Sequence, residues 1–400
     1  MTPVYLDNNA TTRVDPAVVE AMLPFFTEQF GNASSIHAFG AAVGGAIRTA
    51  RRELQALLGA EHDHEIVFTA GGTESDSTAI FSALEALPDR DEIVTSKVEH
   101  PAILAVCDHL EKTGRAKIHR IGVDRSGRLD LDAYRAALSP RVALVTLMWA
   151  NNETGTIFPV EGLAELAKEV GALFHTDAVQ AVGKVPIDLK SSVIDMLSLS
   201  GHKLHGPKGI GALYVRRGTR FKPLIRGGHQ ERGRRAGTEN APAIVGLGKA
   251  AALAAAHMAD ENTRVKALRD RLEAGIVQRI PNCFVNGDRH DRLPNTCNVA
   301  FEFVEGEAIL LHLNRAGIAA SSGSACTSGS LEPSHVLRAM DIPFTAAHGS
   351  IRFSFSRENG EADVDRVLDV MPDILDRLRA LSPFWNGAGE SAAAFRPVYA

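Results

Sequence analysis

Cysteine is scarce in this sequence, and no two cysteines lie close together along the chain. Among 400 residues there are four, Cys107, Cys283, Cys297 and Cys326, and none belongs to a C-x-x-C motif. This spacing excludes a disulfide framework and a zinc knuckle, whose cysteines recur at short intervals. We therefore expect reduced thiols in a cytoplasmic protein.

Long apolar runs are missing as well. No segment approaches the roughly 18 consecutive apolar residues that predict a membrane-spanning helix. The first residues, MTPVYLDNNATT, reach the charged Asp7 before any apolar region of the kind found in a signal peptide. The sequence thus predicts a soluble protein without a membrane partner.

A large excess of either charge is also absent. The chain has 43 Lys and Arg against 48 Asp and Glu, a net charge of -5. Because nucleic-acid binding depends on clustered positive charge, we expect no nucleic-acid partner. With 45% hydrophobic residues, the chain is long enough to form two domains, or one large domain with an elaboration.

Predicted strands and helices alternate over the first 260 residues. Helical patterns begin after Asp15 and Pro16, in GGTESDSTAIFSAL, and at Pro101. This alternation predicts an α/β domain with a parallel or mixed sheet. The predicted strands are EIVFTA (65–70), EIVTS (92–96), VALVTLM (142–148), ALFHT (172–176), DMLSLS (195–200) and IGALYV (210–215).

The pattern changes at about residue 260. A long charged helical segment, ENTRVKALRDRLEAGIVQRI, leads to shorter strands such as CNVAFEF and IRFSFS. We interpret this part as a second, smaller α+β domain.

Lys203 directly follows a predicted buried strand, in LSLSGHKLHGPKGIG. Open α/β sheets bind ligands at the carboxyl ends of their strands, and a loop there can keep an amine neutral and reactive. The alternative is an ordinary surface lysine in a turn. A P-loop is excluded because Lys208 is followed by Gly209 and not by Ser or Thr.

Two further segments also follow predicted strands. TAGGTES places Gly71, Gly72 and Thr73 at the start of a helix, where a phosphate can bind, although such a glycine pair is often only a tight turn. FHTDAVQ places Asp177 at a strand end, where it could pair with a protonated ring nitrogen or simply cap a helix. A phosphate site, a strand-end acid and a strand-end lysine together form a site for pyridoxal phosphate.

Several motifs carry a resemblance to a known family. They are YLDNNATT, GGTES, VEHPA, ANNETG, HTDAVQAVGK, SGHKLHGPKG, GGHQERGRRAGTEN and SSGSACTSG. Together they resemble pyridoxal phosphate-dependent cysteine desulfurases of the class-V aminotransferase group, over nearly the whole chain. The stretch from GSACTSGSLEPSH to IRFSFSR is most similar to the nitrogen-fixation branch, the NifS type. Two departures are Ala33, where the family usually has proline, and Asp76 with Ser77, where many members carry paired asparagines.

The resemblance implies fold type I of the pyridoxal phosphate-dependent transferases. A large domain with a mainly parallel sheet would span 15–260 and bind the cofactor. A smaller α+β domain would combine 1–14 with 261–400, and would carry a mobile catalytic loop at about 321–332. The resemblance also implies a homodimer with shared sites, and we interpret the basic run around Arg234 as a loop at that subunit interface.

The resemblance implies a role for each site residue. Lys203 would bind the cofactor as a Schiff base and then remove the substrate Cα proton, while Asp177 would keep the ring nitrogen protonated. His100 would lie over the ring, although a histidine before proline is otherwise a structural turn residue. Asn152 and Arg352 would bind the substrate carboxylate, the alternative for Arg352 being a surface arginine on an edge strand. The implied cofactor-binding residues are Gly72, Thr73, His100, Asn152, Asp177, Gln180, Ser200, Gly201, His202, Lys203 and, from the neighbouring subunit, Thr238.

Cys326 lies among small residues in SSGSACTSGS. Such a loop would let a thiolate reach the substrate sulfur and then carry it away, whereas Cys297 in CNVAFEF reads as a buried structural thiol. The resemblance implies that L-cysteine becomes L-alanine and leaves a Cys326 persulfide. Cys326 would contact iron–sulfur material during transfer to a scaffold such as NifU, for nitrogenase maturation. Two alternatives are another pyridoxal phosphate enzyme, such as an aminotransferase or selenocysteine lyase, and a non-enzymatic binding protein.

Overall fold

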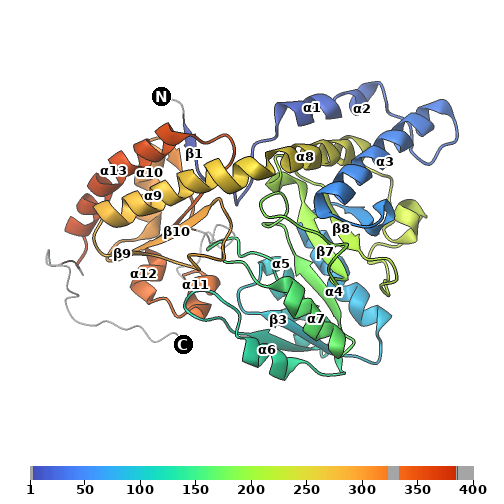
Figure 1. The fold of residues 1–400 in the computed structure, drawn as a ribbon, viewed down its shortest axis with the longest axis horizontal. Helices are drawn as coiled ribbons and strands as arrows, with labels where there is room; N and C mark the ends of the chain where they lie inside the picture. The colour runs from blue at the N-terminus through green and yellow to red at the C-terminus, as the bar shows by residue number, and fades with distance from the viewer. Residues whose placement is uncertain (1–2, 323–332, 384, 386–400) are drawn as a thin grey trace.

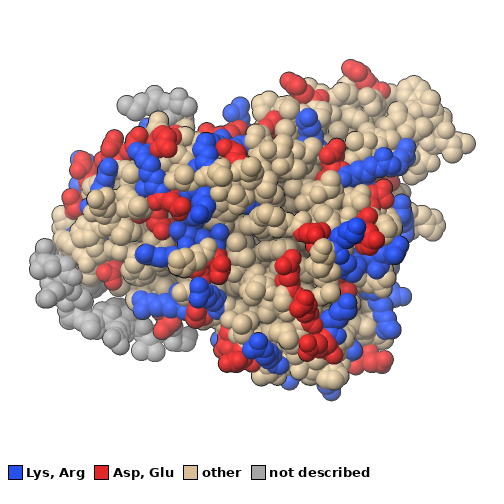
Figure 2. Space-filling view, viewed as in Figure 1, with Lys and Arg blue, Asp and Glu red and all other residues tan. Residues whose placement is uncertain are grey.

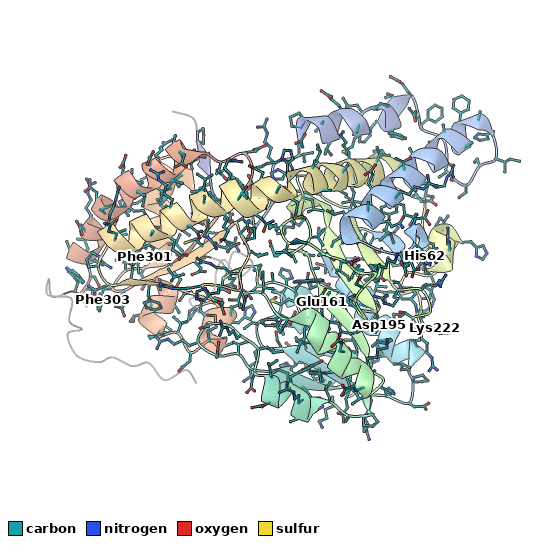
Figure 3. The ribbon with its side chains drawn as sticks, in the orientation of Figure 1. His62, Glu161, Asp195, Lys222, Phe301 and Phe303 are labelled. Atoms are coloured by element: carbon teal, nitrogen blue, oxygen red, sulfur yellow. The ribbon has the colours of Figure 1, made fainter. Side chains whose placement is uncertain are left out.

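The computed structural model describes residues 3–322, 333–383 and 385. Figure 1 shows two lobes side by side. The large lobe is built on a seven-stranded sheet, and the small lobe on a three-stranded sheet with a short two-stranded one. Figure 3 labels residues of both, with His62, Glu161, Asp195 and Lys222 in the large lobe and Phe301 and Phe303 in the small lobe.

The large lobe is an α/β layer structure with a mainly parallel sheet, as the sequence predicts. Its strand order is β2-β8-β7-β6-β5-β3-β4, and β8 runs antiparallel to both neighbours. Five of these strands are buried along their whole length, because helices cover both faces of the sheet. The strands are β2 (Ile66–Thr69), β3 (Glu92–Ser96), β4 (Lys117–Ile121), β5 (Val142–Thr146), β6 (Leu173–Asp177), β7 (Met196–Ser200) and β8 (Gly211–Val215).

The sequence analysis misses only β4 in this sheet. Its sequence, KIHRI, contains three basic residues, and three of its five residues are at least partly exposed because it lies at the sheet edge. All six strands predicted for this lobe are present, with ends shifted by no more than two residues.

The helices of the large lobe begin where local capping favours them. Asp15 accepts a hydrogen bond from the Ala17 N–H at 2.8 Å, and Pro16 is the first helical residue, as predicted. The helices are α1 (Pro16–Met22), α2 (Pro24–Thr27), α3 (Ala38–Leu58), α4 (Gly72–Ala86), α5 (Pro101–Lys112), α6 (Leu131–Ala137), α7 (Val160–Glu169) and α8 (Ala241–Asp260), with short 3-10 turns η1 (Asp63–Glu65), η2 (Gly201–Lys203) and η3 (Gln230–Gly233).

One long helical run joins the two lobes. α8 continues through a π-helical turn, η4 (Glu261–Val265), into α9 (Lys266–Arg279), and crosses the predicted domain boundary without a break. Within the described ranges, Ala241–Arg279 is the one helix long and apolar enough to cross a membrane, with a mean hydropathy of 1.3 over 18 residues. α8 packs so closely on α3 that a Cβ on Gly248 would lie 2.4 Å from the Ala50 Cα. A helix in a protein core can have the same length and hydropathy as a membrane span. The run Ala241–Arg279 is therefore weak evidence for a membrane span.

The small lobe combines both ends of the described chain. β12-β10-β9 form an antiparallel sheet, and β1 near the N-terminus pairs in parallel with β11. Val4 and Leu6 accordingly share a core cluster with residues from 265 to 375. The exact division at 14 and 260 stays a prediction. The elements are β1 (Val4–Tyr5), β9 (Cys283–Val285), β10 (Thr296–Phe301), β11 (Ile318–Ala319), β12 (Ser350–Ser354), α10 (Gly306–Arg315), α11 (His335–Ala339), α12 (Phe344–His348) and α13 (Glu361–Ala380).

The three cysteines that the structure describes are free thiols. Cys107 and Cys297 are fully buried, and Cys283 is half-buried. Burial raises the pKa of Cys297, so the prediction of an inert structural thiol in β10 is confirmed. Cys326 lies outside the described residues. The same is true of the predicted loop around it, except for residues 321 and 322.

Candidate active site

A cavity of about 310 Å³ lies at the carboxyl ends of the parallel strands. Residues that follow β3, β5, β6 and β7 line it, because strands running the same way end at the same edge of a sheet. Asn9 and Ala10, from the N-terminal segment, and Arg352, from β12 of the small lobe, complete its wall. The cavity therefore depends on both lobes.

Lys203 stands at the end of η2, immediately after β7. Its Nζ donates to the backbone oxygens of Asn9 at 2.5 Å and Ala10 at 2.7 Å. Burial, followed by the positive charges of Lys184 and Arg352, lowers the pKa of the Lys203 amine to about 7. The side chain is a partly buried amine with a large neutral fraction at neutral pH, so the alternative of a surface lysine is wrong.

The GGTES segment forms the N-terminus of α4 beside the cavity. Gly71 has φ 154°, a conformation that favours glycine, and a Cβ on Gly72 would lie 2.9 Å from the Val179 Cγ2. Thr73, Ser200 and His202 line the same region. Backbone N–H groups at the positive end of a 15-residue helix attract an anion there.

His202 contributes a neutral ring to this region. Its Nδ1 lies 3.1 Å from the Thr11 Oγ1. Burial and the positive charge of Lys203 lower the pKa of His202 to about 4. At neutral pH the ring can therefore donate or accept a hydrogen bond without adding charge.

Asp177 ends β6 and lines the cavity floor. Its Oδ1 accepts the Val179 N–H at 2.9 Å, so the capping role considered from the sequence is present together with the cavity position. Burial raises the pKa of Asp177, while hydrogen bonding to Val179 and the positive charges of His100 and Lys203 oppose the rise. A protonated nitrogen heterocycle in the cavity would compensate this buried acid.

Two further buried acids lie close to Asp177, and the sequence analysis gives neither of them a role. Asp76 is 1% exposed, lines the cavity, and its Oδ1 has no hydrogen-bond partner among the described residues. Burial and the neighbouring Asp177 raise the pKa of Asp76 well above its usual range. Burial raises the pKa of Glu99 to about 8. The only sequence signals were the Asp76 departure from the family pattern and the position of Glu99 in VEHPA.

His100 and Gln180 are held by short contacts at the cavity wall. The His100 Nδ1 accepts the Ala102 N–H at 3.2 Å as the N-cap of α5, so a neutral ring carries its proton on Nε2. The Gln180 Nε2 donates to the Asn9 backbone oxygen at 2.9 Å. His100 therefore has the structural role of capping α5, and it also lines the ligand cavity.

Arg352 is 2% exposed, which contradicts its alternative interpretation as a surface arginine. Its guanidinium donates to the Asn152 backbone oxygen at 2.9 Å and to the Asp7 Oδ1 at 2.7 Å. The Nε is buried and lacks a hydrogen-bond partner within the described part of the chain. Arg352 also lines the cavity, and a guanidinium in such a position can bind a carboxylate.

Several predicted residues are not brought to this cavity. Gly201 is buried in the turn after β7 and does not line it, and Thr238 is exposed outside it. Cys326 lies outside the described residues, as does its predicted iron–sulfur contact. Across the ranges that the structure describes, no group of three or more His, Cys, Asp or Glu side chains could hold a metal ion.

The residues present fit pyridoxal phosphate, the cofactor implied by the sequence. Two buried polar atoms of cavity residues, the Asp76 Oδ1 and the Arg352 Nε, lack hydrogen-bond partners among the described residues. At Gly72 the packing leaves no room for a Cβ, so the start of α4 lies close against the cavity wall. These features suit a polar ligand. Its volume is within the range of small-molecule sites.

Comparisons with known proteins agree with this geometry. The family described as "Aminotransferase class-V" matches residues 4–367. The chain is 75% identical to "Cysteine desulfurase" from Gluconacetobacter diazotrophicus over 400 residues, which covers all of both proteins. It is 64% identical over 402 residues to "Cysteine desulfurase NifS" from Azotobacter vinelandii, again over all of both chains.

Solved structures show the same similarity. A structure titled "NIFS-LIKE PROTEIN" is 36% identical with a TM-score of 0.88, covering 94% of this chain and 100% of the other. Another, "SspA in complex with cysteine", is 36% identical with a TM-score of 0.78, covering 88% of this chain and 98% of the other.

Proposed function

Because this chain belongs to the class-V aminotransferase family, and within it is a cysteine desulfurase that depends on pyridoxal phosphate, we propose how its own residues carry the reaction. Lys203 is the reactive amine, Arg352 binds the substrate carboxylate, and Cys326 receives the sulfur. The single observation that carries this proposal is that Lys203, Asp177 and Arg352, from three separate segments, line one cavity.

Each part of the cavity suits one part of the cofactor. The N-terminus of α4, with Thr73, Ser200 and His202, would hold the phosphate, and Asp177 would pair with the ring nitrogen. Gln180 would donate to the ring oxygen, and His100 would lie over the ring. When bound, the cofactor supplies an electron sink that stabilises negative charge at the substrate Cα.

The protein residues then handle the proton and the sulfur. The Lys203 amine, which has a large neutral fraction at neutral pH, takes the proton from the substrate Cα. The Cys326 thiolate attacks the substrate sulfur, and the bond between that sulfur and Cβ breaks with its electron pair passing to Cβ. Protonation at Cβ and return of a proton to Cα give L-alanine. One L-cysteine and one thiol thus give one L-alanine and one persulfide, without an external oxidant or reductant.

We also propose a homodimer in which Thr238 reaches the neighbouring site. Thr238 is exposed and lies outside its own cavity. Figure 2 shows a largely uncharged surface at the upper right, over the connection between α2 and α3. Six large apolar side chains are exposed in this part of the chain, as expected of a surface that another subunit covers: Val19, Leu23, Phe26, Phe30, Ile36 and Phe39.

The pathway is the final part of the proposal. The name of the relative "Cysteine desulfurase NifS" supports a role in nitrogen fixation. We propose that sulfur passes in the cytoplasm from Cys326 to an iron–sulfur scaffold protein such as NifU. Radiolabelled sulfur from L-cysteine should move from Cys326 to the purified scaffold. Transfer only to a different acceptor would refute this pathway and leave the desulfurase activity intact.

A single-turnover reaction tests the chemistry. Purified protein is mixed with L-cysteine without reductant, and its intact mass is measured before and after dithiothreitol. We expect one added sulfur per chain, removed by the thiol, accompanied by alanine and absent from Cys326→Ala. Cys297→Ala is the matched control and should still gain sulfur. Full persulfide formation in Cys326→Ala, or pyruvate in place of alanine, would contradict the proposal.

A further inference from the structure

A second, smaller cavity lies behind Lys203. It measures about 30 Å³, which is room for about one water molecule. Lys203 lines both this cavity and the 310 Å³ cavity, and Lys184, His205 and Glu261 line only the smaller one. The reactive amine therefore lies between the ligand site and a buried group of charged residues.

Lys184 is the second amine of this group. It follows β6 in the segment AVGK and is 6% exposed. Its Nζ donates to the Gln180 backbone oxygen at 3.1 Å and to the Gln180 Oε1 at 3.4 Å. Because an ammonium group can only donate, it holds the Gln180 amide with the oxygen toward Lys184 and the NH2 group toward the Asn9 backbone oxygen.

The same contacts connect the two lysines. The Gln180 Nε2 donates to the Asn9 backbone oxygen at 2.9 Å, and the Lys203 Nζ donates to that same oxygen at 2.5 Å. Lys184 is thus linked to Lys203 through one amide and one carbonyl. A side chain that fixes Gln180 also fixes the carbonyl that positions the reactive amine.

The charges around Lys184 come from several elements. Glu261 of η4 faces it, together with His257 of α8, His205 and Lys203 after β7, and Arg357 after β12. Burial lowers the pKa of Lys184 to about 8, and Glu261 opposes that shift. After burial, the charge of Lys184 is the largest cause of the lowered pKa of Lys203. A second cation beside a reactive lysine is an established way to keep its amine neutral.

We propose that Lys184 is a positioning residue of this active site, which orients the Gln180 amide and, as a positive charge behind Lys203, keeps the Lys203 amine neutral and reactive. This inference deepens the proposed function and rests on Lys203 as the reactive amine. Lys184 itself does not line the 310 Å³ cavity.

The test measures the titration of Lys203 in the full chain, without turnover. The cofactor is removed, the protein is labelled with an amine-acetylating reagent over a range of pH, and mass spectrometry follows the Lys203 peptide. In Lys184→Met and Lys184→Gln, we expect the labelling midpoint to rise by about one pH unit, the shift that one nearby charge can produce. Lys184→Arg keeps the charge and should titrate near the wild type.

Lys190→Met is the matched control, since it removes an exposed positive charge from the same connection between β6 and β7. It should leave the midpoint unchanged. If either neutral Lys184 variant is folded, by its thermal unfolding profile, and titrates like the wild type, the proposal is wrong. Two neutral variants are used so that failure of one to fold still leaves a result.

A second measurement separates this inference from the proposed function. The visible absorbance of the bound cofactor should titrate with pH at a higher midpoint in Lys184→Met than in the wild type, and Lys184→Arg should restore it. If Lys203 is not the cofactor lysine, Lys203→Ala keeps that absorbance, which refutes the proposed function. If Lys203→Ala loses it while Lys184→Met titrates normally, only the present inference fails.

Discussion

At the residue scale, the buried guanidinium of Arg352 is the most specific feature of the proposed substrate site. Its partners Asp7 and Asn152 use two nitrogens and leave the Nε free. A planar, fixed donor set of this kind can bind a carboxylate through two parallel hydrogen bonds, whereas the point charge of lysine cannot match that geometry.

Arg352→Lys should therefore reduce kcat/KM for L-cysteine by about 10- to 100-fold, as expected for loss of a charge-assisted hydrogen bond. The loss should lie mainly in KM, which steady-state kinetics measures. Arg271→Lys is the control, because Arg271 is an exposed partner of Glu361 and Asp365. An unchanged KM in a folded Arg352→Lys protein would rule out its role in carboxylate binding.

Glu99 gives a prediction about pH and stability. Its Oε1 accepts from the Ser96 hydroxyl at 2.6 Å and the Met148 N–H at 3.0 Å, while its Oε2 is buried without a partner in the described chain. Burial raises the pKa of Glu99 from 4.5 to about 8. Because the folded pKa lies above the unfolded one, the stabilising contribution is complete below about pH 4.5 and is lost as pH rises toward 8.

Glu99→Gln keeps both accepted hydrogen bonds and cannot ionise. We expect its free energy of unfolding to exceed that of the wild type increasingly from pH 5 to pH 8, by at most about 1.4 kcal/mol per pH unit. Urea unfolding at several pH values measures this. Exposed Glu165→Gln is the control, and parallel pH profiles of Glu99→Gln and the wild type would contradict the prediction.

At the element scale, the junction of β2 and α4 forms the proposed anion site. The chain turns at Gly71, and α4 begins at Gly72 with its N–H groups beside the cavity. Val179, from the turn after β6, packs so close that Gly72 has no room for a Cβ. Position 72 must therefore be glycine because α4 meets the turn after β6, which lies about 100 residues later in the chain.

Gly72→Ala should weaken cofactor binding at least about tenfold, equivalent to about 1.4 kcal/mol, because the new methyl group displaces Val179 or the helix start. Titration of the cofactor-free protein with pyridoxal phosphate measures the Kd. Gly162→Ala in α7 is the matched control, since nothing lies within 4 Å of its added Cβ and alanine favours a helix. Equal Kd values for the two variants would refute the close packing.

At the scale of the whole molecule, two ion pairs hold the segment that precedes Thr238. Arg51 and Glu231 form a buried bidentate ion pair at 2.7 and 2.8 Å. Arg235 pairs with Glu74, in the first turn of α4, at 2.9 Å. These ion pairs hold the basic segment around Arg234 against α3 and α4, while Thr238 remains exposed. The exposure of Thr238 supports the proposal that it serves the site of a second subunit.

Complementation between subunits tests the shared site. If Thr238 serves the neighbouring site, a heterodimer of Lys203→Ala and Thr238→Ala chains contains one intact site, formed by Lys203 of one chain and Thr238 of the other. Its activity should be about half that of the wild type, well above either variant alone. Activity no higher than the mean of the two homodimers would mean that Thr238 acts within its own chain or not at all.

The sequence alone determined the α/β architecture, because alternating hydrophobic patterns and caps such as Asp15 act over a few residues. It also located Lys203, Asp177 and the glycines of α4, since strand ends and helix starts are read locally. The sequence analysis missed strand β4 because three of its five residues are basic, so it lacks the apolar pattern of a strand. It also missed the apolar run of α8, because Lys249 and His257 interrupt that run.

Only the tertiary structure decided how these residues are tuned. The Asn9 carbonyl that Lys203 contacts lies 194 residues away in the chain, and the Asp7 that pairs with Arg352 lies 345 residues away. The pKa shifts of Lys203, Glu99 and Lys184 arise from burial and from charges on other elements. Neither can be read from local sequence, because desolvation and long-range contacts exist only once the lobes have packed together.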